Sequence, residues 1–212
     1  NSDELGLVDT EGVHSGDGSA LEGQNSIRFS PSLTVEALPD NYVHRPEEFN
    51  RLKRSILQKD GQPLTAITSA LKGAGGYGKT TLARALCHDS EIRASFRDGI
   101  IWTTLGENLK PGDLIHKVKA LIYSLTQTNP PVESLEVAIA ELRVALEGRH
   151  LLLVLDDVWF ASDLKPFLQG GSDCARLVTT RNENVLPPDV PGVQVDAMRQ
   201  EEAIQLLYYQ VD

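Results

Sequence analysis

The sequence has little cysteine, no long apolar run and fewer basic than acidic residues. Its two cysteines, Cys87 and Cys174, lie far apart, which argues against a disulfide framework and favours a reducing compartment such as the cytoplasm. No apolar run is long enough to cross a membrane, and no basic and then apolar leader opens the chain, so we expect no membrane partner. The net charge of −10 argues against a general nucleic-acid-binding surface, which needs a basic face.

The composition otherwise suits one medium-sized globular domain with some additional length. Of the 212 residues, 41% are hydrophobic and 24% are charged, which is ordinary for a folded domain with a sizeable core. Residues 1–37 are acidic and rich in glycine and serine, and they show little apolar periodicity. We expect this segment to be a flexible tail, or a linker from a preceding domain, and we expect the folded domain to span residues 38–212.

Segments rich in β-formers alternate with amphipathic helical segments along residues 38–212. Strands are expected at 64–72, 100–105, 151–155, 176–180 and 193–195, and the apolar run at 151–155 is typical of a strand buried on both faces. This alternation predicts an α/β fold of three layers, in which a parallel five-stranded sheet carries helices on both faces.

A glycine-rich segment joins the first expected strand to a helix. Residues 73–81 fit the pattern G-x-x-x-x-G-K-[ST] of a phosphate-binding P-loop, in which backbone N–H groups and a helix N-terminus surround the phosphates. Lys79 would reach the β and γ phosphates, Thr80 would ligate Mg²⁺, and Thr81 would bond a phosphate nearer the ribose. The alternative is an ordinary glycine-rich loop. The predicted nucleotide contacts in this loop are Gly73, Gly75, Gly76, Tyr77, Gly78, Lys79, Thr80 and Thr81.

Two acids end the apolar run at 151–155. Asp156 and Asp157 lie at the carboxyl end of a buried strand, where open α/β sheets bind their ligands. They are typical of a Walker B element, in which Asp156 would orient the magnesium shell near Thr80 and Asp157 would lie near an attacking water. The alternative is that the acid pair simply begins the next helix.

The spacing of these motifs leaves room for another strand between the P-loop strand and the Walker B strand. We expect the strand at 100–105 to be inserted there, which is the arrangement of P-loop ATPases rather than of nucleotide kinases. Arg181 ends the strand at 176–180, so its guanidinium would enter the same crevice and contact a γ phosphate. The alternative is that Arg181 is an ordinary surface residue.

Taken together, these segments resemble the NB-ARC domain of the STAND class of P-loop signalling ATPases. The resemblance covers about residues 42–207 and is carried by residues 43–47, 73–81, 96–102, 151–159 and 177–181. It implies that Val43 and Arg45 lie over the adenine and ribose of bound ATP or ADP, with His44 where the family usually has glycine. The family also lacks the glutamate base of fast ATPases, and Val158 and Trp159 follow the acid pair here. Slow hydrolysis at most is therefore expected, with Lys79, Asp157 and Arg181 as its catalytic residues.

The same resemblance implies a switch, in which nucleotide exchange controls conformation and self-association. It also implies partner domains within the same protein: an effector domain before this region, and helical and winged-helix subdomains and repeats after it. The present chain would then be an excised nucleotide-binding core or a short natural variant. The competing hypotheses are an enzyme whose purpose is ATP turnover, which the missing glutamate disfavours, and a nucleic-acid motor, which the acidic composition disfavours.

Overall fold

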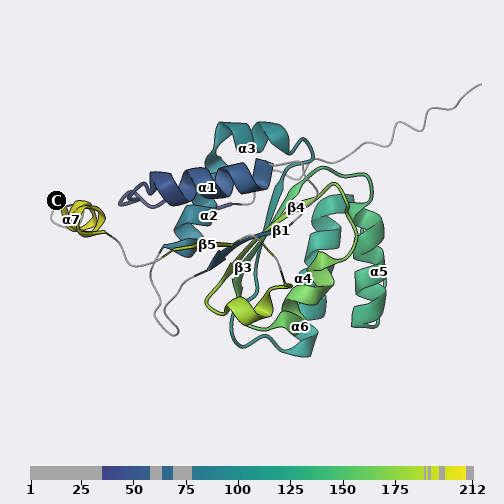
Figure 1. Cartoon of the computed structure of the whole chain (residues 1–212). Helices are drawn as coiled ribbons and strands as arrows, with labels where there is room; N and C mark the ends of the chain where they lie inside the picture. The colour runs from purple at the N-terminus through teal and green to yellow at the C-terminus, as the bar shows by residue number, and fades with distance from the viewer. Residues whose placement is uncertain are drawn as a thin grey trace, which may run out of the picture.

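The computed structural model describes residues 35–57, 64–68, 78–188, 190, 192–195 and 199–208 (Figure 1). Residues 1–34, which hold most of the expected tail, lie outside the described residues. So do residues 69–77, which hold the last part of the expected strand at 64–72 and the first part of the glycine-rich segment at 73–81. Among the described residues, no helix combines the length and the apolar character that a membrane span requires.

The strands form one parallel sheet, as the alternation of segments predicts. They are β1 (Leu64–Thr68), β2 (Ile100–Thr104), β3 (Leu152–Val158), β4 (Ala175–Thr180) and β5 (Gly192–Gln194), and their order across the sheet is β2-β3-β4-β1-β5. All pairings are parallel, so the carboxyl ends of the strands meet at one edge. Helix α2 and Arg181 come after β1 and β4 at this edge, and the acid pair lies within the carboxyl end of β3.

The strand order corrects one sequence-based prediction. The P-loop strand β1 and the acid-bearing strand β3 are separated in the sheet, but the strand between them is β4. The expected strand at 100–105 is instead β2, which lies at the sheet edge and pairs with β3. Order along the chain did not reveal order in the sheet, because the chain returns from β2 to the adjacent β3 and only then inserts β4 beside β1.

Helices cover both faces of the sheet (Figure 1). On one face lie α1 (Pro46–Leu57), α2 (Lys79–His88) and α3 (Ser90–Ser95), which pack against alternate residues of the strands such as Leu152 and Val154. On the other face lie α4 (Pro111–Thr126), α5 (Leu135–Leu146) and α6 (Ala161–Leu164), which pack against the intervening residues such as Leu153 and Leu155. This period of two explains why the acid-bearing strand reads as a continuous apolar run. The remaining helices are η1 (Lys165–Leu168), η2 (Glu183–Val185) and α7 (Gln200–Tyr208).

A tight turn and a buried arginine fix the start of β4. The Arg176 guanidinium, 3% exposed, donates hydrogen bonds to the carbonyl oxygens of Phe167 (3.0 Å), Gly171 (3.1 Å), Cys174 (2.9 Å) and Gly170 (2.5 Å). Gly171 has φ +58°, and a Cβ there would lie 2.9 Å from the Cys174 Sγ. The turn that directs β4 between β1 and β3 therefore requires glycine.

We predict that Gly171→Ala lowers the free energy of unfolding by about 1–3 kcal/mol, because the new methyl group meets a left-handed backbone and the Cys174 side chain. Gly112→Ala is the matched control. Gly112 lies in α4 with open space around its Cα, so this change leaves stability unchanged or raises it by up to about 1 kcal/mol. Denaturant titration of both variants measures the difference, and equal stability of the two would contradict the account of the turn.

Candidate functional site

The N-terminus of α2 is open to an anionic ligand. Gly78 precedes the helix with φ 79° and ψ 16°, a left-handed conformation that favours glycine, and no side chain of the described residues caps the helix. The first N–H groups of an α-helix have no partner within the helix, and the positive end of its dipole lies at the same point. The start of α2 therefore has the geometry of a phosphate site.

Asp156 joins this helix to two strands. The Asp156 Oδ1 accepts hydrogen bonds from the Thr80 hydroxyl of α2 at 2.9 Å and from the Thr179 hydroxyl of β4 at 2.6 Å. The carboxylate is 5% exposed. The structure thus brings together Thr80 and Asp156, the predicted magnesium pair, and adds Thr179, which the sequence analysis did not single out. Its only signal was its place just before Thr180 and Arg181.

A bulge gives the two acids different surroundings. Leu155 pairs with Val178 and Val158 pairs with Thr180, so β3 holds one more residue than β4 in this stretch. Asp157 has φ +55°, which is rare for a residue other than glycine, and its N–H donates to the Thr179 hydroxyl at 2.9 Å. As a result Asp156 is held against Thr80, whereas Asp157 lines the neighbouring cavity. Such strain is concentrated at functional sites.

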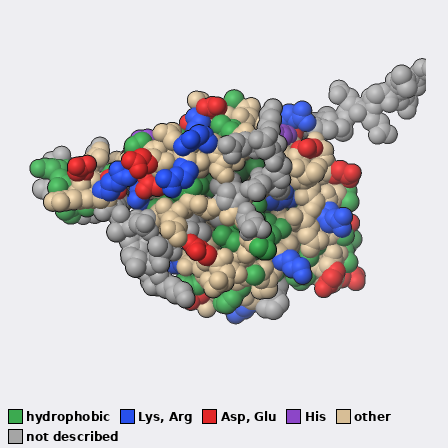
Figure 2. Space-filling model, viewed as in Figure 1, with side chains coloured by type: hydrophobic (Ala, Val, Ile, Leu, Met, Phe, Trp, Pro, Cys, Tyr) green, Lys and Arg blue, Asp and Glu red, His purple; other side chains and the backbone are tan. Residues whose placement is uncertain are grey.

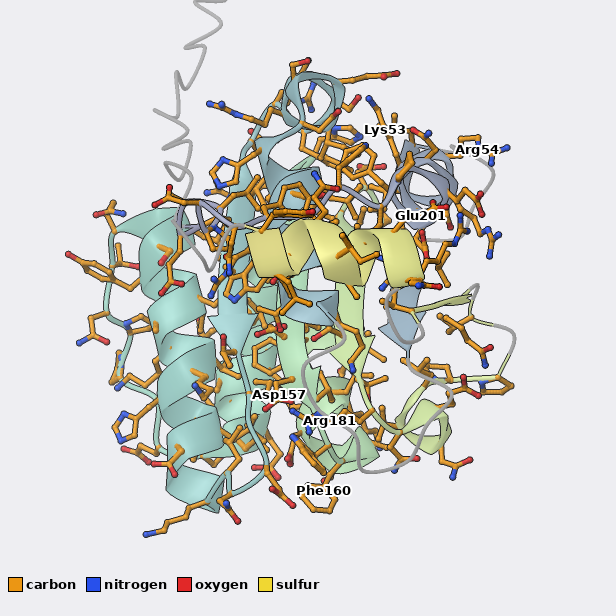
Figure 3. All side chains as sticks on the ribbon, turned by 90° about the vertical axis from the view of Figure 1, so that its left-hand side faces the viewer. Lys53, Arg54, Asp157, Phe160, Arg181 and Glu201 are labelled. Carbon is orange, nitrogen blue, oxygen red and sulfur yellow. The ribbon has the colours of Figure 1, made fainter. Side chains whose placement is uncertain are left out.

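Two cations line the same cavity, which has a volume of about 190 Å³ and is bounded by Gly78, Lys79, Thr80, Thr81, Asp157, Thr179, Thr180 and Arg181. Figure 3 shows Asp157 and Arg181 near each other at this edge. Burial, with the nearby positive charge of Arg181, lowers the pKa of Lys79, and the carboxylates of Asp157 and Asp156 partly offset this. The predicted catalytic residues Lys79, Asp157 and Arg181 therefore share one cavity that suits a polyanion.

A second cavity of about 190 Å³ also adjoins the N-terminus of α2, and it shares Gly78 and Thr81 with the first. Val43 and Arg45, both 5% exposed, line it together with Tyr42. Val43 and Arg45, which are predicted to lie over the nucleoside, thus line a cavity next to the one that Lys79 and Arg181 line. Gly73, Gly75, Gly76 and Tyr77, also predicted contacts, lie outside the described residues.

Helix α7 adds a wall to this second cavity. Its Leu206 lines the cavity, and its Glu202 carboxylate lies 3.6 Å from the Arg45 guanidinium, which also donates to Glu48 at 2.7 Å. Sequence reasoning missed α7 as a part of the site because 156 residues lie between Arg45 and Glu202 in the chain and no local motif marks the pairing.

Comparison with known proteins gives a match over most of the chain. The family model for the NB-ARC domain matches residues 46–212. The regulatory protein AfsR of Streptomyces coelicolor is 36% identical over 140 residues, covering 65% of this chain and 14% of AfsR. Apoptotic protease-activating factor 1 of Danio rerio is 29% identical over 209 residues, covering 88% of this chain and 16% of that protein. The chain thus spans less than a fifth of the length of either relative.

A solved structure shows the same fold. The ORC2 protein of Aeropyrum pernix, solved as ADPNP and ADP complexes, superposes with a TM-score of 0.51 at 19% identity, covering 82% of this chain and 53% of that chain.

Ion pairs connect α7 to α1 and to the segment before it. Arg199, which precedes the helix, donates to both carboxylate oxygens of Glu47 at 3.2 and 2.6 Å, and no described residue of α7 is buried. Figure 2 shows basic and acidic side chains interleaved where α7 meets α1. The Arg199 hydrogen bond lowers the pKa of Glu47, and the same bond raises the pKa of Arg199.

We predict that salt releases α7. Raising the ionic strength from about 0.01 M to about 1 M shortens the screening length from about 30 Å to about 3 Å, so the attraction of Arg199 to Glu47 weakens. Amide hydrogen exchange in α7 should then become faster, whereas exchange in α5, which is anchored by the buried Leu142 and Leu146, should change little. Equal exchange of α7 at both ionic strengths would show that ion pairs do not hold it.

Proposed function

The chain belongs to the NB-ARC family of STAND signalling ATPases, and from this premise we propose that it is a molecular switch that binds ADP or ATP with Mg²⁺. The observation that carries the proposal is the 2.9 Å hydrogen bond from Thr80 to Asp156 at the uncapped N-terminus of α2, beside a cavity that holds Lys79 and Arg181. A hydroxyl, a carboxylate and two cations in this arrangement match a magnesium–polyphosphate.

The donor set suits Mg²⁺ bound together with phosphate. Among the described residues, no cluster of three or more His, Cys, Asp or Glu side chains could hold a metal by itself. Mg²⁺ is usually held by one or two protein oxygens, several waters and the substrate phosphates, so Thr80 and Asp156 suffice. The ion would supply charge neutralisation at the phosphates. Thr179 would keep Asp156 oriented toward Thr80 through its 2.6 Å hydrogen bond.

The other side chains would divide the nucleotide between the two cavities. Lys79 and the first N–H groups of α2 would bind the phosphates, and Thr81, which lines both cavities, would bond the phosphate nearest the ribose. Val43 and Arg45 would lie over the adenine and ribose. Arg181 would contact the γ phosphate, which only ATP possesses, so it would distinguish ATP from ADP.

We propose that hydrolysis is slow and that the signal is carried by which nucleotide, ATP or ADP, is bound. Asp157 is the one carboxylate among the described residues that line the first cavity, and the next residues, Val158 and Trp159, offer no base. A site that hydrolyses its nucleotide slowly would keep that nucleotide bound, which suits a signalling switch better than rapid turnover would.

Helix α7 would carry this state to the rest of the protein. It contacts the nucleoside cavity through Leu206 and Glu202, and it lies at the carboxyl end of the matched region. We propose that it leads to helical and winged-helix subdomains, and that nucleotide exchange in a longer protein with effector and repeat domains permits self-association. The second candidate function is an ATPase whose purpose is turnover, which the presence of Asp157 in the cavity favours.

We predict that Lys79→Ala weakens binding of ADP and ATP by about 30-fold or more, because the polyphosphate loses its main cationic partner. Lys119→Ala, on α4 and outside both cavities, is the matched control and should bind as the wild type does. Isothermal titration calorimetry measures both. Unchanged ADP affinity of the Lys79 variant would exclude the cavity as the phosphate site.

Steady-state hydrolysis distinguishes the switch from the turnover enzyme. Without any partner, we expect a turnover number below about 0.01 s⁻¹, against about 1 s⁻¹ or more for enzymes whose purpose is phosphoryl transfer. Asp157→Asn should lower the residual rate further, which assigns that rate to this site. Rapid multiple turnover by the isolated chain would favour the ATPase.

A further inference from the structure

An aromatic side chain lies against the predicted γ-phosphate sensor. Trp159 follows β3 and Arg181 follows β4, and the ends of these strands are paired through Val158 and Thr180. The Arg181 Cζ lies over the Trp159 ring, 5.3 Å from its centroid. This is the distance of a cation–π contact, for which tryptophan offers the strongest ring face.

The orientation of Trp159 is not explained by its own polar group. The indole Nε1 is buried and has no hydrogen-bond partner among the residues that the structure describes. A buried tryptophan usually places its N–H against an acceptor, so an unsatisfied one calls for another reason. Here the indole N–H is left without a hydrogen bond to any described residue, whereas the face of the ring contacts Arg181.

Arg181 lies in a cavity with a second cation. It lines the same cavity as Lys79, and the two positive charges repel each other. Within the described part of the chain, no carboxylate forms a salt bridge with Arg181. The face of the indole attracts the guanidinium without occupying its N–H donors, so those donors stay available for an incoming phosphate.

We propose that Trp159 is a positioning residue, which holds Arg181 at the cavity so that its N–H donors meet the terminal phosphate of ATP. This inference rests on the proposed nucleotide-binding function and deepens it. Trp159 would not itself touch the nucleotide, since it does not line the cavity. Its contribution would appear only where Arg181 acts, which is on ATP and not on ADP.

The test compares the affinities for a non-hydrolysable ATP analogue and for ADP. Trp159→Leu removes the ring, and we expect it to weaken binding of the ATP analogue by about 3-fold to about 30-fold relative to binding of ADP. Arg181→Ala should also lower the preference for the ATP analogue. Adding Trp159→Leu to Arg181→Ala should then change the preference no further, because the two residues act as one unit.

The chain offers a matched control. Trp102 of β2 lies under the Arg84 guanidinium at 6.0 Å, and neither residue lines either cavity. Trp102→Leu therefore removes a similar Arg–Trp pair and should leave the ratio of the two affinities unchanged. Trp159→Phe keeps a ring of weaker attraction and a closer volume, so it should fold if the leucine variant does not and give a smaller loss of the same kind.

Three results would overturn the inference: equal weakening of both ligands by Trp159→Leu or Trp159→Phe, stronger binding of the ATP analogue, or a full additional effect in the Arg181→Ala background. A failure of the proposed function itself would appear differently, because the wild type would then bind neither nucleotide.

Discussion

Much of the site depends on one carboxylate oxygen. The Asp156 Oδ1 accepts hydroxyl hydrogen bonds from Thr80 and Thr179, so a helix and two adjacent strands meet at a single buried atom. A buried carboxylate without partners is strongly disfavoured, so the two hydroxyl hydrogen bonds stabilise the burial of Asp156. The same contacts place the start of α2 against the carboxyl edge of the sheet, where the cavities lie.

The rest of the site balances charges that the fold brings close. The bulge in β3 turns Asp157 away from the Asp156 cluster and into the cavity, at the cost of a left-handed backbone. Lys79 and Arg181 face the same space, the carboxylates of Asp157 and Asp156 partly offset their repulsion, and the Trp159 ring lies against Arg181. A bound magnesium–polyphosphate would compensate both sets of charges. Its phosphates would neutralise Lys79 and Arg181, and its metal ion would neutralise the carboxylates.

The local features of the site were predictable from the sequence, and its long-range features were not. The pattern around Lys79 and Thr80 and the apolar run before Asp156 each lie in one short segment, so spacing alone predicts their positions. The insertion of β4 between β1 and β3 depends on packing across the sheet, and the extra residue of the bulge has no sequence signature. The contact of Glu202 with Arg45 likewise joins residues from opposite ends of the folded domain.

The central claim is that Thr80, Asp156 and Lys79 converge on one magnesium–polyphosphate. A crystal structure of the chain with Mg²⁺ and a non-hydrolysable ATP analogue tests it most directly. The account predicts a metal ion bound to the Thr80 Oγ1 with Asp156 beside it, the β and γ phosphates at Lys79 and the N-terminus of α2, and the nucleoside against Val43 and Arg45. Phosphates bound away from α2, or a metal ion remote from Thr80 and Asp156, would contradict it.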